Sequence, residues 1–218
     1  MQFQLANQGL QWSDSFFLLN GAINTVQMAI CAATIGTVLG TVLGWIRSVS
    51  SAATTITSPF VDMLRSVPMV ITLILSNSVL SILGFPTSPF WFGIAALSAW
   101  MAAVTAEVAR FAFRSVPANY QRGARSLGMT YFQELRYVSI PLAYRAGLTS
   151  WIGLLLGLIK DTALASIIGY VEFMRSAQIL ITRTHETWLL LLGTGLFYFV
   201  ICYPISRYGR YLERKVAA

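Results

Sequence analysis

The sequence predicts an all-α integral membrane protein with about five transmembrane helices. Of its 218 residues, 56% are hydrophobic and 11% are charged, whereas a soluble domain is about 25% charged. The mean hydropathy is +0.66. The first long apolar run, residues 15–46, contains no charged residue at all. It exceeds the roughly 20 residues that a helix needs to cross hydrocarbon, and the chain length suits one domain.

Uncharged runs and the turn residues between them divide the chain into five expected spans. The expected spans are, in order, residues 15–46, from Pro59 to the turn-forming stretch 84–89, from that stretch to 107–114, 146–170 and 187–206. We expect Pro59 to open the second span, because proline is favoured in the first turn of a helix. Residues 47–58 and 172–186 are expected to be polar connections.

Arginine and lysine residues predict the orientation of these spans. Six arginines flank or occupy the connection between the third and fourth spans, namely Arg110, Arg114, Arg122, Arg125, Arg136 and Arg145. The positive-inside rule then places the N-terminus outside and the C-terminus in the cytoplasm. We expect residues 1–14 to be an external segment, 15–210 the membrane domain and 211–218 a cytoplasmic tail. Membrane orientation also explains the net charge of +7, so nucleic acid is not expected as a partner.

Glycines recur at every fourth position in the first expected span. Gly36, Gly40 and Gly44 lie on one helical face, and such a stripe lets a neighbouring helix approach closely. The neighbour can be another span of the same chain or a second subunit, and we favour packing within the chain.

The basic connection at residues 119–145 has the pattern of two short amphipathic helices. We expect the first helix at about 120–127 and the second at about 131–139, with Gly128 at the break between them. Pro141 is expected to stop the second helix and start the next element. An amphipathic helix pair at a membrane surface needs a cover on its apolar side, which can be lipid, the protein's own spans or a second protein.

This connection resembles the EAA loop of bacterial ABC importer permeases. Gly123 and Ala124 stand where that motif has two alanines, and the motif continues as Arg125-Ser126-Leu127-Gly128 and Ile140-Pro141-Leu142. Arg122 stands where the motif has glutamate, which is a departure from the family pattern. Four further stretches resemble the polar amino acid importer branch in the same order: Leu64-Arg65-Ser66-Val67-Pro68, Ala106-Glu107-Val108-Ala109-Arg110, Ser115-Val116-Pro117 and Lys160-Asp161-Thr162-Ala163-Leu164.

The resemblance implies a type-1 transmembrane domain that serves as the permease subunit of an ATP-driven amino acid importer in the bacterial inner membrane. It implies as partners two ABC ATPase subunits, a second permease copy or a sister permease, an external solute-binding protein, an amino acid substrate and membrane lipid. The first short helix of the loop would contact the ATPase. The residues expected at this contact are Tyr120, Gly123, Ala124, Ser126, Leu127 and Gly128.

Charged residues inside the expected spans are candidates for the translocation path, since charges in a membrane normally face a bundle interior or a water-filled path. The candidates are Glu107, Lys160, Asp161 and Thr162. Asp161, in the middle of the fourth span, could meet the ammonium group of an amino acid. A structural ion pair, or a position near the outer interface, explains it equally well. Glu107 shares a helical face with Arg110 and Arg114, which suits either arginines reaching the headgroups or a gating network.

Two other classes of protein stay open at this point. One is a stand-alone ion-coupled transporter or channel that uses Glu107 or Asp161, and the other is a membrane scaffold without a path. Because Lys160 offsets the charge of Asp161, the sequence disfavours a path for strictly basic amino acids.

The sequence does not indicate an enzyme. Neither Lys160 nor Lys215 follows a glycine, so the phosphate-binding loop of ATPases is missing. The single histidine, His185, lies in an expected connection and makes a poor metal site alone. Cys31 and Cys202 fall within apolar runs and are expected to be small core residues. We therefore expect no catalytic residue, no cofactor and no metal.

Overall fold

A computed structural model describes residues 9–84 and 88–217, and all regular structure in these residues is helical. The elements are α1 (Trp12–Val49), α2 (Ser51–Ser66), α3 (Met69–Ile82), α4 (Pro89–Arg114), α5 (Ala118–Ser126), α6 (Tyr131–Glu134), a π-helical turn (Leu135–Ser139), α7 (Ile140–Asp161), a 3-10 segment (Thr162–Ile168), α8 (Phe173–Thr184) and α9 (Thr187–Ala217). Parts of the expected external segment 1–14 and of the turn 84–89 lie outside the described residues.

Four stretches of the described residues are long and apolar enough to cross a membrane, namely α1, α4, α7 with its flanking turns, and α9. The pair α2 and α3 passes the same test together, although the two helices meet at an angle of 107°. The expected all-α membrane fold is therefore confirmed, with four spans, or five when the bent pair counts as one.

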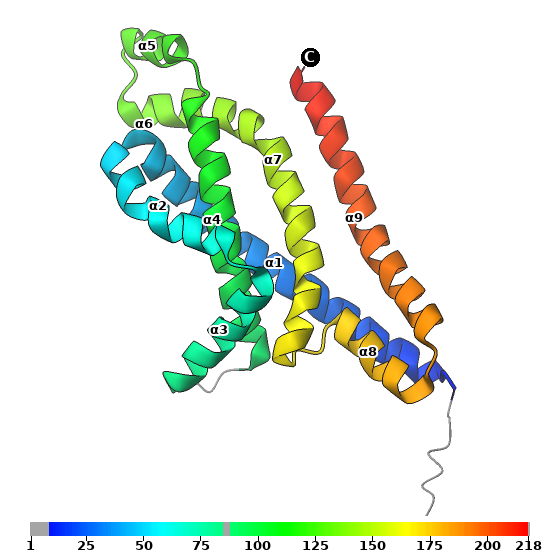
Figure 1. The fold of residues 1–218 in the computed structure, drawn as a ribbon. Coiled ribbons are helices and arrows are strands. Elements are labelled where there is room, and N and C mark those ends of the chain that lie inside the picture. The colour runs from blue at the N-terminus through cyan, green and yellow to red at the C-terminus, as the bar shows by residue number, and fades with distance from the viewer. Residues whose placement is uncertain (1–8, 85–87, 218) are drawn as a thin grey trace, which may run out of the picture.

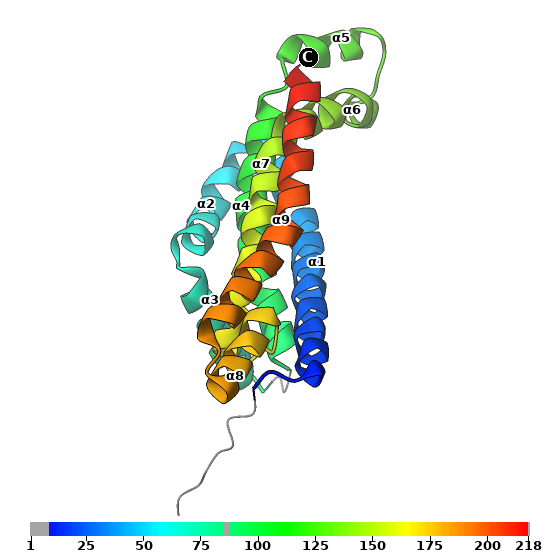
Figure 2. The same cartoon turned by 90° about the vertical axis from the view of Figure 1, so that its right-hand side faces the viewer.

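The long helices form a bundle whose two ends differ (Figures 1 and 2). The loop with α5 and α6 lies at one end, together with the last residues of α9, and we call this the α5 end. At the other end, the α8 end, lie α8 and the start of α1. The main core lies between α1, α4 and α7 and includes Met28, Leu97, Met101 and Leu158, all of them fully buried.

The glycine stripe of α1 packs directly against α4. A Cβ atom added to Gly36 would lie 2.5 Å from Met101 Cβ, and one added to Gly40 would lie 2.6 Å from the carbonyl oxygen of Ala102. At Gly44 the carbonyl oxygen of Ala106 is 2.5 Å away. These distances leave no room for any side chain. The interpretation of the stripe as packing within the chain is confirmed.

Replacing Gly40 with valine is therefore expected to destabilise the protein by about 1–3 kcal/mol, the usual cost of overpacking. The melting temperature in detergent should fall by about 5 °C. Gly193→Val in α9 is the matched control, because a Cβ atom there meets nothing within 4 Å. Equal shifts for both variants would contradict the packing argument.

Two of the expected connections are helical instead. Residues 51–58 belong to α2, whose start is capped by Ser50 Oγ, which accepts a hydrogen bond from the Ala53 N–H at 3.2 Å. The hydroxyls of this Ser/Thr-rich stretch bond to carbonyls four residues back, as Thr57 Oγ1 does to Ala53 at 2.7 Å, and so are compatible with a helix. Pro59 therefore lies inside α2 and does not open a span. Residues 173–184, also expected as connection, form α8.

The boundaries around α7 and α9 also differ from expectation. Pro141 does not stop a helix, because it follows a π-helical turn in which the Ile140 N–H bonds to the Leu135 carbonyl. There the regular i to i−4 ladder is already interrupted, so proline is tolerated. Asp161 is the last residue of α7 and not the middle of a span. The expected tail is a continuation of α9 as far as Ala217.

Candidate functional site

The helix α5 stands apart at its end of the bundle (Figure 1). It begins after Pro117 and ends at Ser126, close to the expected bounds of 120–127. Gly128 has a φ of +82°, and the Met129 N–H bonds to the Ala124 carbonyl at 3.3 Å. This is the left-handed helix ending that glycine favours, so the predicted break at Gly128 is observed.

Five of the six residues expected to contact a partner are exposed, while Ala124 is buried. The exposed residues are Tyr120, Gly123, Ser126, Leu127 and Gly128. Leu127 has 82% of its surface accessible, which is unusual for a leucine. A Cβ atom on Gly123 would meet nothing within 4 Å. The outer side of α5 is thus open, and Ala124 supports the helix from within.

A chain of polar side chains connects α5 to the helix that follows it. The Ser139 hydroxyl donates a hydrogen bond to the Glu134 carboxylate, and Gln121 Nε2 of α5 donates to Ser139 Oγ at 3.4 Å. Glu134 is only 4% exposed. The π-helical turn brings residues five apart onto one side, so it places Ser139 against Glu134. We call these three residues the Gln121–Ser139–Glu134 link, and its pairing across the turn was not predicted from the sequence.

Removing the hydroxyl from this link is expected to loosen α5. A buried group left without its hydrogen bond costs about 1–3 kcal/mol, so Ser139→Ala should speed hydrogen exchange of the α5 amides by about tenfold. Mass spectrometry of peptides covering residues 118–127 would measure this. Thr182→Ala in α8 is the control, since its exposed hydroxyl bonds only to Gln178 of the same helix. Unchanged exchange in α5 would show that the link does not hold it.

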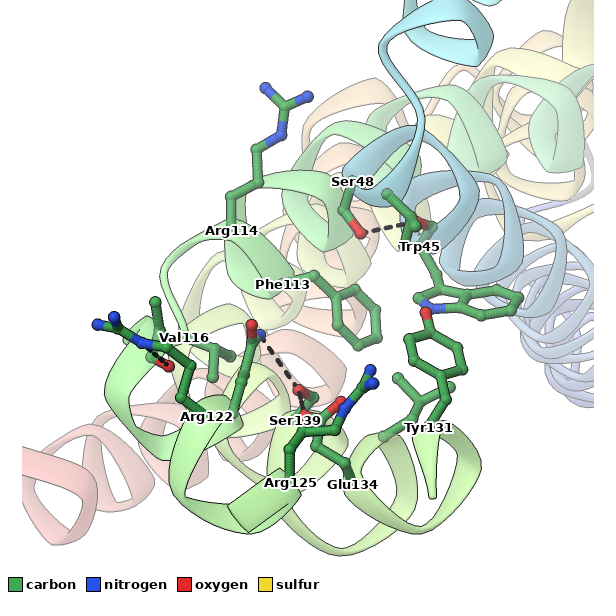
Figure 3. A pocket seen from close by; sticks show the side chains of 14 residues that line it. Trp45, Ser48, Phe113, Arg114, Val116, Arg122, Arg125, Tyr131, Glu134 and Ser139 are labelled. Carbon is green, nitrogen blue, oxygen red and sulfur yellow. Dashed lines mark hydrogen bonds between the residues drawn. The ribbon is translucent and has the colours of Figure 1, made fainter. Parts of the chain in front are cut away.

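A cavity of about 690 Å³ lies behind α5, between the ends of α1 and α4 and the α6 segment (Figure 3). The Arg125 guanidinium lies 5.3 Å from the centre of the Tyr131 ring and points toward the cavity, whereas Arg114 and Arg122 point away from it (Figure 3). Arg122, the residue that replaces the glutamate of the motif, donates to the Ala118 carbonyl at 3.4 Å. Its side chain therefore lies along α5.

Glu107 belongs to a charged cluster that joins α1, α2 and α4. Its carboxylate accepts hydrogen bonds from Arg47 Nη1 at 3.1 Å and from Arg110 Nε at 3.0 Å. Arg47 is 2% exposed and also donates to Ser58 Oγ of α2 at 3.1 Å. Arg114 donates to the Arg47 carbonyl at 3.3 Å and not to Glu107. Of the residues that the sequence placed on one face of α4, only Arg110 bonds to Glu107, and the sequence did not indicate Arg47 as the buried partner.

The structure does not bring Glu107 together with the other path candidates. Glu107 lies in the half of α4 nearer to the α5 end, whereas Lys160 and Asp161 end α7 at the α8 end. Lys160 is exposed and Asp161 is half-buried, and neither forms an ion pair within the described residues. Thr162 is buried, and its hydroxyl donates to the Ile159 carbonyl at 2.7 Å.

A second buried carboxylate, missed from the sequence, fixes α8 in place. Glu172 accepts hydrogen bonds from the N–H groups of Met174 and Arg175, both at 2.7 Å, and from the Tyr198 hydroxyl of α9 at 3.2 Å. Burial raises the pKa of Glu172, and the two backbone donors oppose that rise. Its position directly before a helix is the typical place of a capping acid, which was the available signal. Within the described part of the chain, no group of three His, Cys, Asp or Glu side chains could hold a metal ion.

Comparisons with known proteins point to one kind of membrane component. Residues 36–218 match the family described as binding-protein-dependent transport system inner membrane component. The chain is 28% identical to the glutamate/aspartate import permease protein GltK of Escherichia coli O157:H7, over 92% of this chain and 94% of that protein. It is 27% identical to the arginine transport system permease protein ArtQ of Bacillus subtilis, over 92% of each chain.

Solved structures agree with these matches. An amino acid ABC transporter crystallised with histidines has a chain with a TM-score of 0.81 and 27% identity, covering 92% of this chain and 94% of that one. A chain of the MetNI methionine ABC transporter in an inward-facing conformation has a TM-score of 0.80, covering 95% of this chain and 99% of that one. At 20% identity this second likeness concerns the fold alone.

Proposed function

The chain belongs to the family of inner-membrane components of binding-protein-dependent transport systems, and from this premise we propose that it is the permease subunit of an ATP-driven amino acid importer. The relatives that support this proposal are named as permeases for glutamate and aspartate, for arginine and for glutamine. These substrates differ in charge, so the shared function is amino acid import and the preferred side chain differs among relatives. The same relatives favour this function over an ion-coupled transporter or channel.

The open side of α5 is the single observation that carries the coupling mechanism. We propose that two separate ATPase subunits grip this helix on two permeases, which are copies of this chain or one copy and a sister permease. Leu127 offers an apolar contact that nothing in the described chain covers, and Tyr120 and Gly123 lie exposed on the same short helix. The Gln121–Ser139–Glu134 link would pass movement of α5 to α7. ATP-driven closure of the ATPases then rocks the spans between inward-open and outward-open states.

In this proposal the α5 end faces the cytoplasm and the α8 end faces the external solute-binding protein. The arginines of the α5 loop and the basic end of α9 lie at that cytoplasmic end, as the positive-inside rule requires. Reporter fusions at the two termini would test this orientation, and a cytoplasmic N-terminus would overturn it.

Reconstitution in liposomes tests the function itself. The permease with its ATPase, a solute-binding protein and ATP should accumulate a radiolabelled amino acid, while the permease alone should not transport it under any ion gradient. Uptake by the permease alone, driven by a proton or sodium gradient, would instead support the ion-coupled alternative.

We propose that Asp161, with Lys160 and Thr162 beside it, lies near the outer part of the path. Asp161 is half-buried and forms no ion pair within the described residues, so its carboxylate can meet a substrate ammonium. Asp161→Asn is then expected to lower amino acid uptake by about tenfold, as the loss of one charged contact of about 1.5 kcal/mol predicts, without changing ATPase binding. Thr149→Ala, an exposed position on α7, is the control. Normal uptake by the Asn variant would remove Asp161 from the path.

A further inference from the structure

A cleft runs along the surface between α7 and α9 in the half of the bundle nearer the α5 end. Its volume is about 460 Å³. Leu148, Trp151 and Leu155 of α7 and Ile205 of α9 form its apolar walls, and Arg145 lies at its rim with Tyr208. The two helices approach closely beside it, since a Cβ atom on Gly209 would lie 3.0 Å from Ile152 Cγ2. At this point α7 and α9 are therefore in contact, and Ile152 also lines the cleft.

The polar end of this cleft carries a cation without a partner. Arg145 is exposed and makes no hydrogen bond, ion pair or ring contact with any described residue. Tyr144 and Tyr208 flank it, both largely exposed. Tyrosines gather at the level of lipid headgroups, and basic sites between spans on the cytoplasmic side bind anionic headgroups. This rim has the chemistry of a headgroup site.

The apolar part has the dimensions of one leaflet. From Arg145 to Leu155 the axis of α7 advances by about 15 Å at 1.5 Å per residue, which is half of a hydrocarbon core of about 30 Å. Trp151 presents only its apolar ring to the cleft, because its Nε1–H donates to Thr37 Oγ1 at 2.9 Å. The walls thus offer an acyl chain an apolar surface along its whole length within a leaflet.

We propose that this cleft binds one anionic phospholipid of the cytoplasmic leaflet. Its phosphate pairs with Arg145 between the two tyrosines, and one acyl chain lies along Leu148, Trp151 and Leu155. A helix of a second protein fits these observations less well, because an apolar helix would bury Arg145 without a counter-ion. The proposal rests on the proposed orientation of the chain, in which the α5 end is cytoplasmic.

Native mass spectrometry of the detergent-purified complex would measure the binding of phosphatidylglycerol and of phosphatidylcholine. The intact protein is expected to bind phosphatidylglycerol more tightly. Arg145→Gln should weaken that binding by about fivefold, because one arginine near an anionic surface contributes about 1 kcal/mol. Arg207→Gln is the matched control, since Arg207 is an exposed arginine of α9 outside the cleft. Its effect should be less than twofold.

A second variant tests the chain-binding part of the cleft. Leu148→Trp fills the groove and should reduce bound phosphatidylglycerol while Arg145 stays in place. Equal binding of the two lipids, equal effects of Arg145→Gln and Arg207→Gln, or displacement by millimolar inorganic phosphate would each overturn the proposal. So would a cross-link from residue 208 to a second permease copy. None of these measurements needs ATP or transport, so a failed lipid result and a failed import assay can be told apart.

Discussion

Replacing Leu127 with glutamate is expected to lower ATP-driven amino acid uptake by at least about 30-fold while the permease stays folded. Leu127 is 82% exposed at the end of α5, so the new charge meets water in the free permease and causes no strain. In the proposed complex it would instead be buried against the ATPase. Apolar anchors of that kind contribute about 2 kcal/mol or more to binding, which corresponds to about 30-fold in affinity.

Co-purification of the ATPase with the tagged permease measures this effect directly, and the melting temperature of the permease alone shows that the fold is kept. Leu10→Glu is the control, because Leu10 is also an exposed leucine but precedes α1 at the α8 end. If Leu127→Glu still retained the ATPase and still supported uptake, α5 would not be the contact that couples the two proteins.

Gly128→Pro tests the same contact through the backbone. Proline holds φ near −65°, whereas Gly128 requires +82°, so the ending of α5 cannot form. The ATPase should again be lost, but here the hydrogen exchange of α5 should rise as well. If the α5 amides exchanged rapidly and the ATPase still bound, an ordered α5 would not be required for the contact with the ATPase.

The sequence predicted those features of the fold that depend on local sequence pattern. It indicated the α5 loop, the break at Gly128 and the close packing of the glycine stripe, because each of these depends on local pattern: a charge run, a left-handed glycine and a repeat of four. The runs without charge predicted about five spans, and the described residues contain four, or five when the bent pair of α2 and α3 counts as one. These features need no knowledge of distant contacts.

The sequence failed where tertiary contacts override local composition. Residues 51–58 differ for a local reason: they were expected to form a connection, but their hydroxyls bond to carbonyls of the same helix four residues back. The π-helical turn at Leu135–Ser139 could not be anticipated. It places Ser139 against the buried Glu134 carboxylate, a contact that no local pattern indicated. Arg47 follows an uncharged run and was expected to begin the polar connection 47–58. In the structure Ser58 of α2 and Glu107 of α4 both bond to it. Only the three-dimensional arrangement makes it a buried cation.

That burial leads to an asymmetric prediction for the Arg47–Glu107 pair. Glu107→Leu should destabilise the permease by about 3–5 kcal/mol, because it leaves Arg47 buried without an anion. The melting temperature in detergent should then fall by about 10 °C. Arg47→Met should cost much less, since Glu107 is 25% exposed and keeps its contact with Arg110 at 3.0 Å. Removing Glu107, the less buried of the two side chains, is thus expected to cost more than removing Arg47.

The double variant Arg47→Met/Glu107→Leu decides between a structural and a transport role for the carboxylate. With both charges removed, no buried cation remains unpaired, and replacing a buried ion pair by apolar groups is often neutral. The double variant should therefore melt within about 3 °C of Arg47→Met. A stable double variant that still imports amino acids would show that Glu107 serves to hold α1, α2 and α4 together. One that is stable but transports nothing would return the Glu107 carboxylate to the translocation path, for which the sequence made it a candidate.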